Sequence, residues 1–147
     1  MSELDDFRAA KDDFFVHDRQ SPLSRAQRQE FKGLNYFPEN PALRLEVQVE
    51  PFPQMDEIEM QTSTGDVQRY TRYGRVKFTV DGQAPRETYG AGRYLEPEPL
   101  GNGTFLVDFN YAYNPYCAYN DAWSCPLTPF ENRVKVPIKA GEKNFHE

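Results

Sequence analysis

The strongest constraint on the fold is a two-residue alternation of apolar and polar side chains that recurs from residue 43 onward. In the clearest run, charged or amide residues separate Leu43, Leu45, Val47 and Val49. This pattern is typical of a strand with one buried face, because successive side chains point to opposite faces of a sheet. Proline or glycine turns separate the runs and favour antiparallel pairing. Further strands are predicted at residues 57–62, 67–73, 75–80, 88–95, 104–113 and 133–138.

Two helices are expected before the strands. An amphipathic helix over residues 3–16, capped by Ser2, is predicted by apolar residues at helical spacing: Leu4, Phe7, Ala10, Phe14 and Phe15. Ser24 and Gln27 form a capping box for a short second helix, which Gly33 is expected to end. The sequence therefore predicts a mainly β (α+β) fold, an antiparallel β-barrel or sandwich of about seven or eight short strands with two N-terminal helices.

Length and charge limit the class of protein. A chain of 147 residues fits a single domain, with a helical cap at residues 1–33 and a β domain at 43–145. Residues 1–60 hold 13 acidic and 7 basic side chains, which accounts for the net charge of -6. An acidic surface repels phosphate backbones, so no nucleic-acid partner is expected. The chain has no apolar run long enough for a membrane span and no secretory pattern at its N-terminus, so no membrane partner and a cytoplasmic location are expected.

The segment 114–132 is the predicted location of a site. It contains Pro115, Pro126 and Pro129 and lacks helical or strand periodicity. Loops of this length in compact domains are usually functional, and its aromatic side chains need a packing surface. The segment is expected to cover a barrel mouth, a common place for ligands. A small polar or anionic ligand is expected beneath it.

Residues near this loop carry the chemistry that such a ligand needs. Arginines offer paired N–H donors to anions, carboxylates and amides offer hydrogen bonds, and aromatic rings offer an apolar wall. For the stretch 89–93, with its two glycines, a bulged strand is favoured over a phosphate loop. The predicted ligand-binding residues are Tyr89, Arg93, Asp108, Asn110, Asn114, Tyr116, Trp123 and Arg133.

Two other functions stay open. One is an enzyme of unknown class that uses Asp108 or Glu131 as acid or base, with Glu142 as a third carboxylate to consider. The other is a structural or interaction protein. Cys117 and Cys125 are weak metal candidates, because zinc prefers four Cys or His ligands. Buried thiols are the favoured interpretation of this pair, ahead of a disulfide, and no cofactor is predicted.

Several motifs resemble one known family. The residues that carry the resemblance are Glu87–Tyr94, Asp108–Asn110, Ala112–Pro115 with Cys117, Cys125–Leu127, Glu131–Arg133 and Ala140–Lys143, and more loosely Tyr36–Pro38. Together they resemble the prokaryotic family called domain of unknown function 1684. That family has no established activity, so the resemblance supports the location of a site and implies no reaction. Similar proteins are longer between Val80 and Tyr89. An open sheet edge at this point would favour a homodimer.

Overall fold

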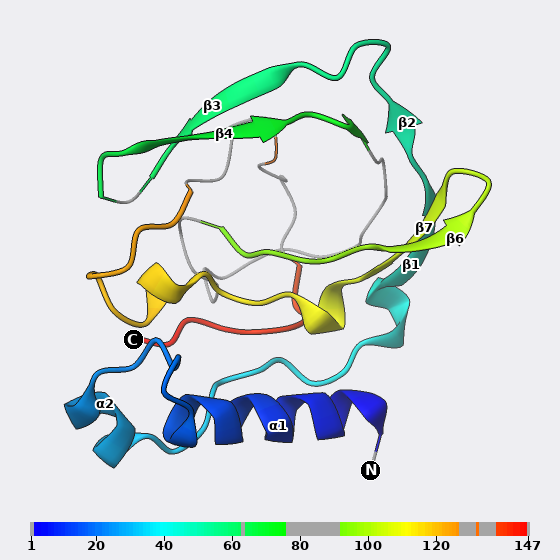
Figure 1. Ribbon diagram of the computed structural model, residues 1–147. Helices are drawn as coiled ribbons and strands as arrows, with labels where there is room; N and C mark the ends of the chain where they lie inside the picture. The colour runs from blue at the N-terminus through cyan, green and yellow to red at the C-terminus, as the bar shows by residue number, and fades with distance from the viewer. Residues whose placement is uncertain (1, 63, 76–91, 127–131, 133–137, 147) are drawn as a thin grey trace.

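A computed structural model describes residues 2–62, 64–75, 92–126, 132 and 138–146. Helix α1 lies along one side of the molecule, and the hairpin of strands β3 and β4 lies on the opposite side (Figure 1). The C-terminal segment passes between α1 and residues 109–118 (Figure 1). The predicted strands at 75–80 and 133–138 fall largely outside the described residues, as do Tyr89, Glu131 and Arg133. The strand predicted at 88–95 is described from residue 92 on, where Tyr94 forms an isolated antiparallel bridge with Tyr113.

The two predicted helices are confirmed within the described chain. Helix α1 spans Glu3–His17, and the Ser2 hydroxyl accepts the backbone N–H of Asp5 at 3.1 Å. Helix α2 spans Arg25–Glu30 and begins with the predicted capping box at Ser24. It ends at Glu30, three residues before Gly33. Neither helix is long and apolar enough to cross a membrane, and this holds for every helix in the described part of the chain.

The inward face of α1 carries two cations as well as apolar side chains. Leu4 and Phe15 are buried. Residues at positions 4, 8, 11 and 15 follow helical spacing, so Arg8 and Lys11 share that face. The Arg8 guanidinium lies 4.4 Å from the centre of the Tyr36 ring. The helix therefore presents positive charge to the interior, and that charge needs partners there.

The described strands are all antiparallel and form separate small sheets. The largest has the order β1-β7-β6, with Leu45 opposite Val107 and Val47 opposite Phe105. Strand β2 pairs with β5, and β3 pairs with β4. The strand bounds are Arg44–Gln48 for β1, Glu50–Pro51 for β2, Glu57–Gln61 for β3, Val67–Thr71 for β4, Gly74–Arg75 for β5, Glu98–Gly101 for β6 and Thr104–Asp108 for β7.

The mainly β class with antiparallel sheets is confirmed, and two details differ from the prediction. Strands β2 and β6 were not predicted. The strand predicted at 104–113 ends at Asp108, because the Asp108 carboxylate accepts the backbone N–H of Asn110 at 3.0 Å and turns the chain into the 3-10 helix η2, Phe109–Tyr111. The described strands do not close a barrel among themselves.

The predicted loop 114–132 packs, in its described part, against the helical cap. It contains a 3-10 turn, η3, at Tyr116–Ala118. Tyr119 is fully buried, and its ring meets that of Phe15 edge-on at 4.9 Å. Further along, the Trp123 indole N–H donates to the Pro22 carbonyl at 3.0 Å. These contacts put residues 114–119 in the core between the helices and the C-terminal segment, while residues 121–124 are exposed.

Candidate functional site

The buried carboxylate of Glu142 is the centre of a polar region in the interior of the described chain. Glu142 is 1% exposed. Its Oε2 accepts from the Lys11 ammonium at 2.5 Å and from the Asn114 backbone N–H at 3.2 Å, and its Oε1 accepts from the Tyr119 hydroxyl. With Tyr36 these residues are the Glu142 cluster. It joins α1, the 114–126 segment and the C-terminal segment.

Tyr36 and Asn114 bring unpaired polar atoms to this cluster. The backbone of Tyr36 forms an antiparallel bridge with Glu142. Its hydroxyl oxygen is buried and has no hydrogen-bond partner in the described chain. The Asn114 side chain donates through Nδ2 to the Lys143 carbonyl at 2.9 Å, while its buried Oδ1 also lacks a partner among the residues that the structure describes. Such atoms are few in native proteins, and each needs an explanation.

Burial keeps the tyrosines of the cluster protonated. Burial raises the pKa of Tyr119, and the neighbouring Glu142 carboxylate raises it further. The pKa of Tyr36 is raised for the same two reasons, with a smaller contribution from Asp12. Both hydroxyls are therefore neutral donors at physiological pH.

Arg93 clamps the C-terminal segment from the other side. Its guanidinium donates to the backbone carbonyls of Ile138 at 2.9 Å, of Glu142 at 3.0 Å and of Ala140. Burial lowers the pKa of Arg93 to about 10, and Glu142 opposes this shift. Gly141 has a φ of +76°, and a Cβ there would lie 2.6 Å from the Ala112 carbonyl oxygen. The segment that carries Glu142 is thus held tightly on two sides.

The other predicted ligand residues lie elsewhere and bind the protein's own backbone. Asn110 accepts from the Asn40 N–H at 2.8 Å and donates to the Asn40 carbonyl at 2.9 Å. Asp108 lies 3.8 Å from Arg44 besides capping η2. Tyr116 and Trp123 meet edge-on at 5.2 Å over the helical cap. The structure therefore brings Arg93 and Asn114 together and places the remaining described candidates in two other regions.

The two cysteines lie close together and are both buried. The Cys117 backbone N–H donates to the Cys125 sulfur at 3.2 Å. Burial raises the pKa of the Cys125 thiol to about 11. In the described ranges, no group of three or more His, Cys, Asp or Glu side chains is arranged to hold a metal ion.

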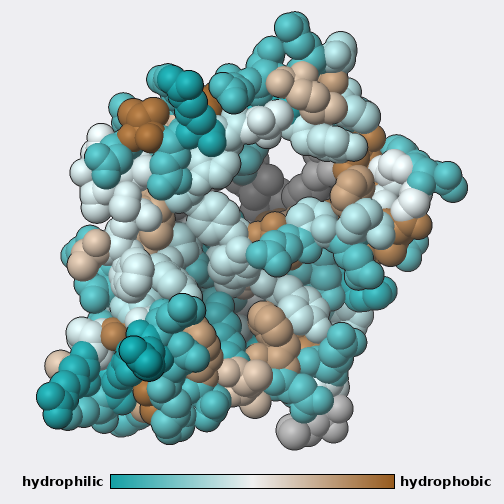
Figure 2. Space-filling view, in the orientation of Figure 1, coloured by the Kyte–Doolittle hydropathy of each residue, from teal (hydrophilic) through white to brown (hydrophobic). Residues whose placement is uncertain are grey.

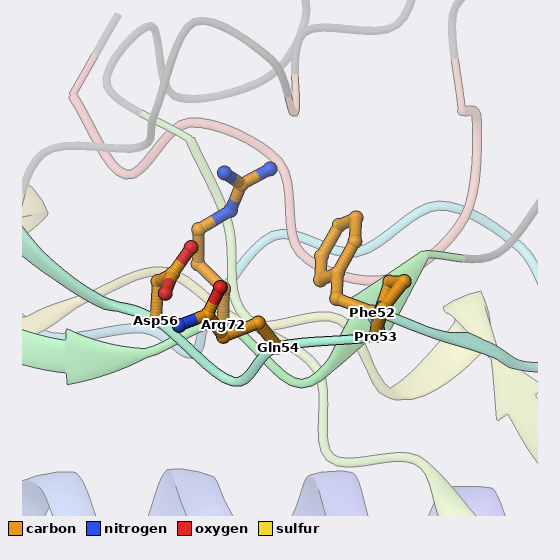
Figure 3. A pocket seen from close by; sticks show the side chains of 5 residues that line it. All are labelled: Phe52, Pro53, Gln54, Asp56 and Arg72. Atoms are coloured by element: carbon orange, nitrogen blue, oxygen red, sulfur yellow. The ribbon is translucent and has the colours of Figure 1, made fainter.

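An open cleft lies between the end of β2 and the β3–β4 hairpin. It measures about 270 Å³ and is lined by Phe52, Pro53, Gln54, Asp56 and Arg72. We call it the Phe52–Arg72 cleft. Figure 3 shows the side chains of Phe52, Asp56 and Arg72 extending to the same side of the ribbon. The surface is also hollowed beneath the β3–β4 hairpin (Figure 2).

Two guanidinium groups share one aromatic ring at this cleft. The Arg72 guanidinium carbon lies 4.6 Å from the Phe52 ring centre, and that of Arg75 lies 5.4 Å from it. Two backbone hydrogen bonds hold the walls together, from the Arg72 N–H to the Asp56 carbonyl and from the Phe52 N–H to the Tyr73 carbonyl, both at 2.9 Å. Arg69, Arg72 and Arg75 are the basic residues of the stretch 69–75. The structure places two of them against an aromatic ring.

Comparison with known proteins decides the family. The model of a family described as "Protein of unknown function (DUF1684)" matches residues 29–86 and 81–143. The chain belongs to the DUF1684 family. A solved structure, the solution NMR structure of an uncharacterized protein of Haloarcula marismortui, is 32% identical with a TM-score of 0.68. The match covers 96% of this chain and 92% of the other. No curated protein matches the chain.

The DUF1684 motifs that carry the resemblance meet at the Glu142 cluster. Tyr36, Arg93, Asn114 and Glu142 come from four separate motifs, and all contact the C-terminal segment. The two matched segments of the family model meet at residues 81–86, where this sequence is expected to be shorter than its relatives. The cluster thus gathers residues from several of these motifs, and the resemblance did not indicate which residues pair there.

Sequence reasoning missed Lys11 and Tyr119 as members of the cluster. Lys11 stands between Leu4 and Phe15 on one helical face, and a cation at such a position is a signal for a buried partner. Tyr119 was recognised only as an aromatic residue that needs packing. Nothing local in the sequence shows that its hydroxyl reaches a carboxylate 23 residues away.

Proposed function

We propose that this DUF1684 protein is a binding module for a small organic anion and that the Phe52–Arg72 cleft is its binding site. The observation that carries the proposal is the pair of guanidinium groups on the Phe52 ring at the edge of an open cleft. Guanidinium groups bind carboxylates through paired, charge-assisted hydrogen bonds. An aromatic floor beside them suits the flat apolar part of the same molecule.

The remaining lining residues narrow the class of ligand. Gln54 offers both donors and an acceptor, while Asp56 accepts from ligand hydroxyl or amine groups. The volume of about 270 Å³ lies just below the range of about 300–1,000 Å³ for small-molecule sites, so the ligand must be small. A flat carboxylate of the size of one aromatic ring, carrying a further hydrogen-bond donor, matches these features.

The contacts of the candidate carboxylates favour binding over acid–base catalysis. Asp108 is the acid–base candidate within the described residues, and its carboxylate caps η2 and faces Arg44. Glu142 accepts hydrogen bonds from three donors of the protein itself. Carboxylates that are bonded to groups of the protein itself support the fold and are poorly placed to exchange protons with a substrate.

The test uses salicylate as the probe, with salicylamide as its uncharged analogue. Amide and guanidinium NMR shifts are followed during titration of the full chain. Salicylate is expected to perturb Phe52, Gln54 and Arg72, and salicylamide to bind more weakly by about tenfold, because the charged hydrogen bonds are lost. The matched variants are Arg72→Gln, expected to weaken salicylate binding, and Arg69→Gln, expected to leave it unchanged.

Arg69 is the matched control because its side chain is 72% exposed, lies on β4, and is not part of the cleft lining. Equal loss of binding in the two variants would show a general charge effect and contradict a specific site. Titration shifts confined to other parts of the chain would also contradict it.

A further inference from the structure

The Glu142 cluster contains two buried polar atoms that its own residues leave unsatisfied. They are the Tyr36 hydroxyl and Asn114 Oδ1. The whole Asn114 residue is 1% exposed, so bulk water does not reach it. Burying a polar group without a partner is unfavourable, and native proteins usually supply one. This observation points to a guest molecule inside the cluster.

The chemistry of the two atoms defines what the guest must offer. Asn114 Nδ2 donates to the Lys143 carbonyl, which fixes the orientation of the amide and leaves Oδ1 as the atom in need of a donor. The Tyr36 hydroxyl can donate its proton and can also accept one. A hydroxyl group meets both requirements, since it donates to Oδ1 and accepts from the tyrosine.

The charges of the cluster favour a neutral guest. The Glu142 carboxylate already accepts from Lys11, Tyr119 and the Asn114 backbone. A cationic guest would meet the Lys11 ammonium, and an anionic guest would meet Glu142. Both kinds of ion would be costly in a buried place where the opposite charges are already paired.

We propose that the Glu142 cluster is a second binding site, which holds a neutral hydroxyl group between Asn114 Oδ1 and the Tyr36 hydroxyl. The group belongs either to a water molecule or to a small polyol. This site lies under the 114–126 segment, where the sequence predicted a ligand. It shares no residue with the Phe52–Arg72 cleft and does not depend on the proposed anion binding, so either proposal can fail alone.

The decisive variant is Tyr36→Phe. It removes the hydroxyl and keeps the ring under the Arg8 guanidinium, so the variant is expected to fold. Tyr70→Phe is the control, because the Tyr70 hydroxyl is bonded to Gln68 on the exposed hairpin. If a guest is bound, Tyr36→Phe shifts the urea midpoint downward, since a satisfied hydrogen bond is lost. A hydroxyl that truly lacks a partner predicts the opposite, an upward shift, because its removal relieves a buried unsatisfied group.

Native mass spectrometry and high-resolution crystallography then distinguish the two sources. Excess mass that disappears on denaturation and in Tyr36→Phe identifies a polyol, which glycerol or inositol should restore after dialysis. An unchanged mass with ordered density within hydrogen-bond distance of Asn114 Oδ1, weaker in the variant, identifies water. A raised urea midpoint together with the absence of density beside Asn114 Oδ1 would overturn the proposal.

Discussion

Breaking the ion pair between Lys11 and Glu142 should lower the free energy of unfolding by several kilocalories per mole, unlike breaking an ion pair on the surface. The ammonium and carboxylate are 2.5 Å apart, and their side chains are 16% and 1% exposed. Removal of one partner leaves the other charged and buried, which costs about 3–5 kcal/mol. We therefore expect Lys11→Met and Glu142→Gln each to cost that much. Lys11→Met should cost more, because Glu142 is the more deeply buried charge.

The double variant separates pairing from burial. Lys11→Met with Glu142→Gln removes both charges, so its cost should fall below the sum of the single costs by about 2–3 kcal/mol, as for residues in one network. Urea unfolding at neutral pH measures all three. With a slope of about 1–3 kcal/mol per molar urea, each single variant should move the midpoint by at least about 1 M.

The exposed pair of Arg69 and Glu59 is the control for this experiment. Its atoms are 4.0 Å apart and its side chains are 72% and 68% exposed. Arg69→Met should cost less than about 1 kcal/mol. Single costs as small as this at Lys11 and Glu142, or additive costs in the double variant, would refute the view that the cluster is a buried, coupled network.

Three further predictions follow from the same structure. The pKa values of Tyr36 and Tyr119 are raised in the folded protein, so the stability that their protonated hydroxyls contribute is fully present below pH 10 and is lost as the pH rises further. Because the folded state retains two protons that the unfolded state loses, the free energy of unfolding should fall by about 2.7 kcal/mol per pH unit. Tyr36→Phe should halve that slope in urea titrations. Gly141→Ala should lower the free energy of unfolding by about 1–3 kcal/mol more than Gly65→Ala does. Both glycines have positive φ, but of the two only Gly141 has carbonyl oxygens within 3 Å of the added Cβ. Equal unfolding midpoints for the two variants would contradict this prediction. The pKa of the Cys125 thiol is raised to about 11, so in the folded protein at pH 8 it should react with Ellman's reagent far more slowly than in the protein unfolded by urea. The rates are measured with Cys117 changed to alanine. Equal rates in the two states would show that the thiol is accessible in the folded protein.

The sequence predicted those parts of the fold that depend on neighbouring residues. Helix α1 and strand β1 follow from periodicity, and the cap at Ser2 and the capping box at Ser24 follow from residues close in the sequence. Strand β7 was predicted too long, because the alternation of aromatic residues continues past Asp108. The hydrogen bond that this carboxylate accepts from the Asn110 backbone N–H was the stronger influence.

The site was harder to predict, because its contacts join distant segments. Arg93 was predicted to be a ligand-binding residue, and its partners in the described chain are backbone carbonyls, which have no sequence signature. Asn110 likewise binds the backbone of Asn40, 70 residues away. The Phe52–Arg72 cleft depends on how β2 meets the hairpin. Periodicity identifies strands, and it cannot show which strand ends come together.

The pairing of Lys11 with Glu142 also bears on when the protein can fold during its synthesis. The two residues are 131 positions apart. At roughly 5–20 residues per second, a ribosome adds Glu142 about 7–26 s after Lys11. During that interval the 15-residue helix α1 lacks its buried partner, and an isolated helix of this length is only marginally stable in water. Chains truncated before and after residue 142 and released from the ribosome should therefore differ sharply in protease resistance. A chain interrupted shortly before that residue exposes its cationic helix face to chaperones and proteases.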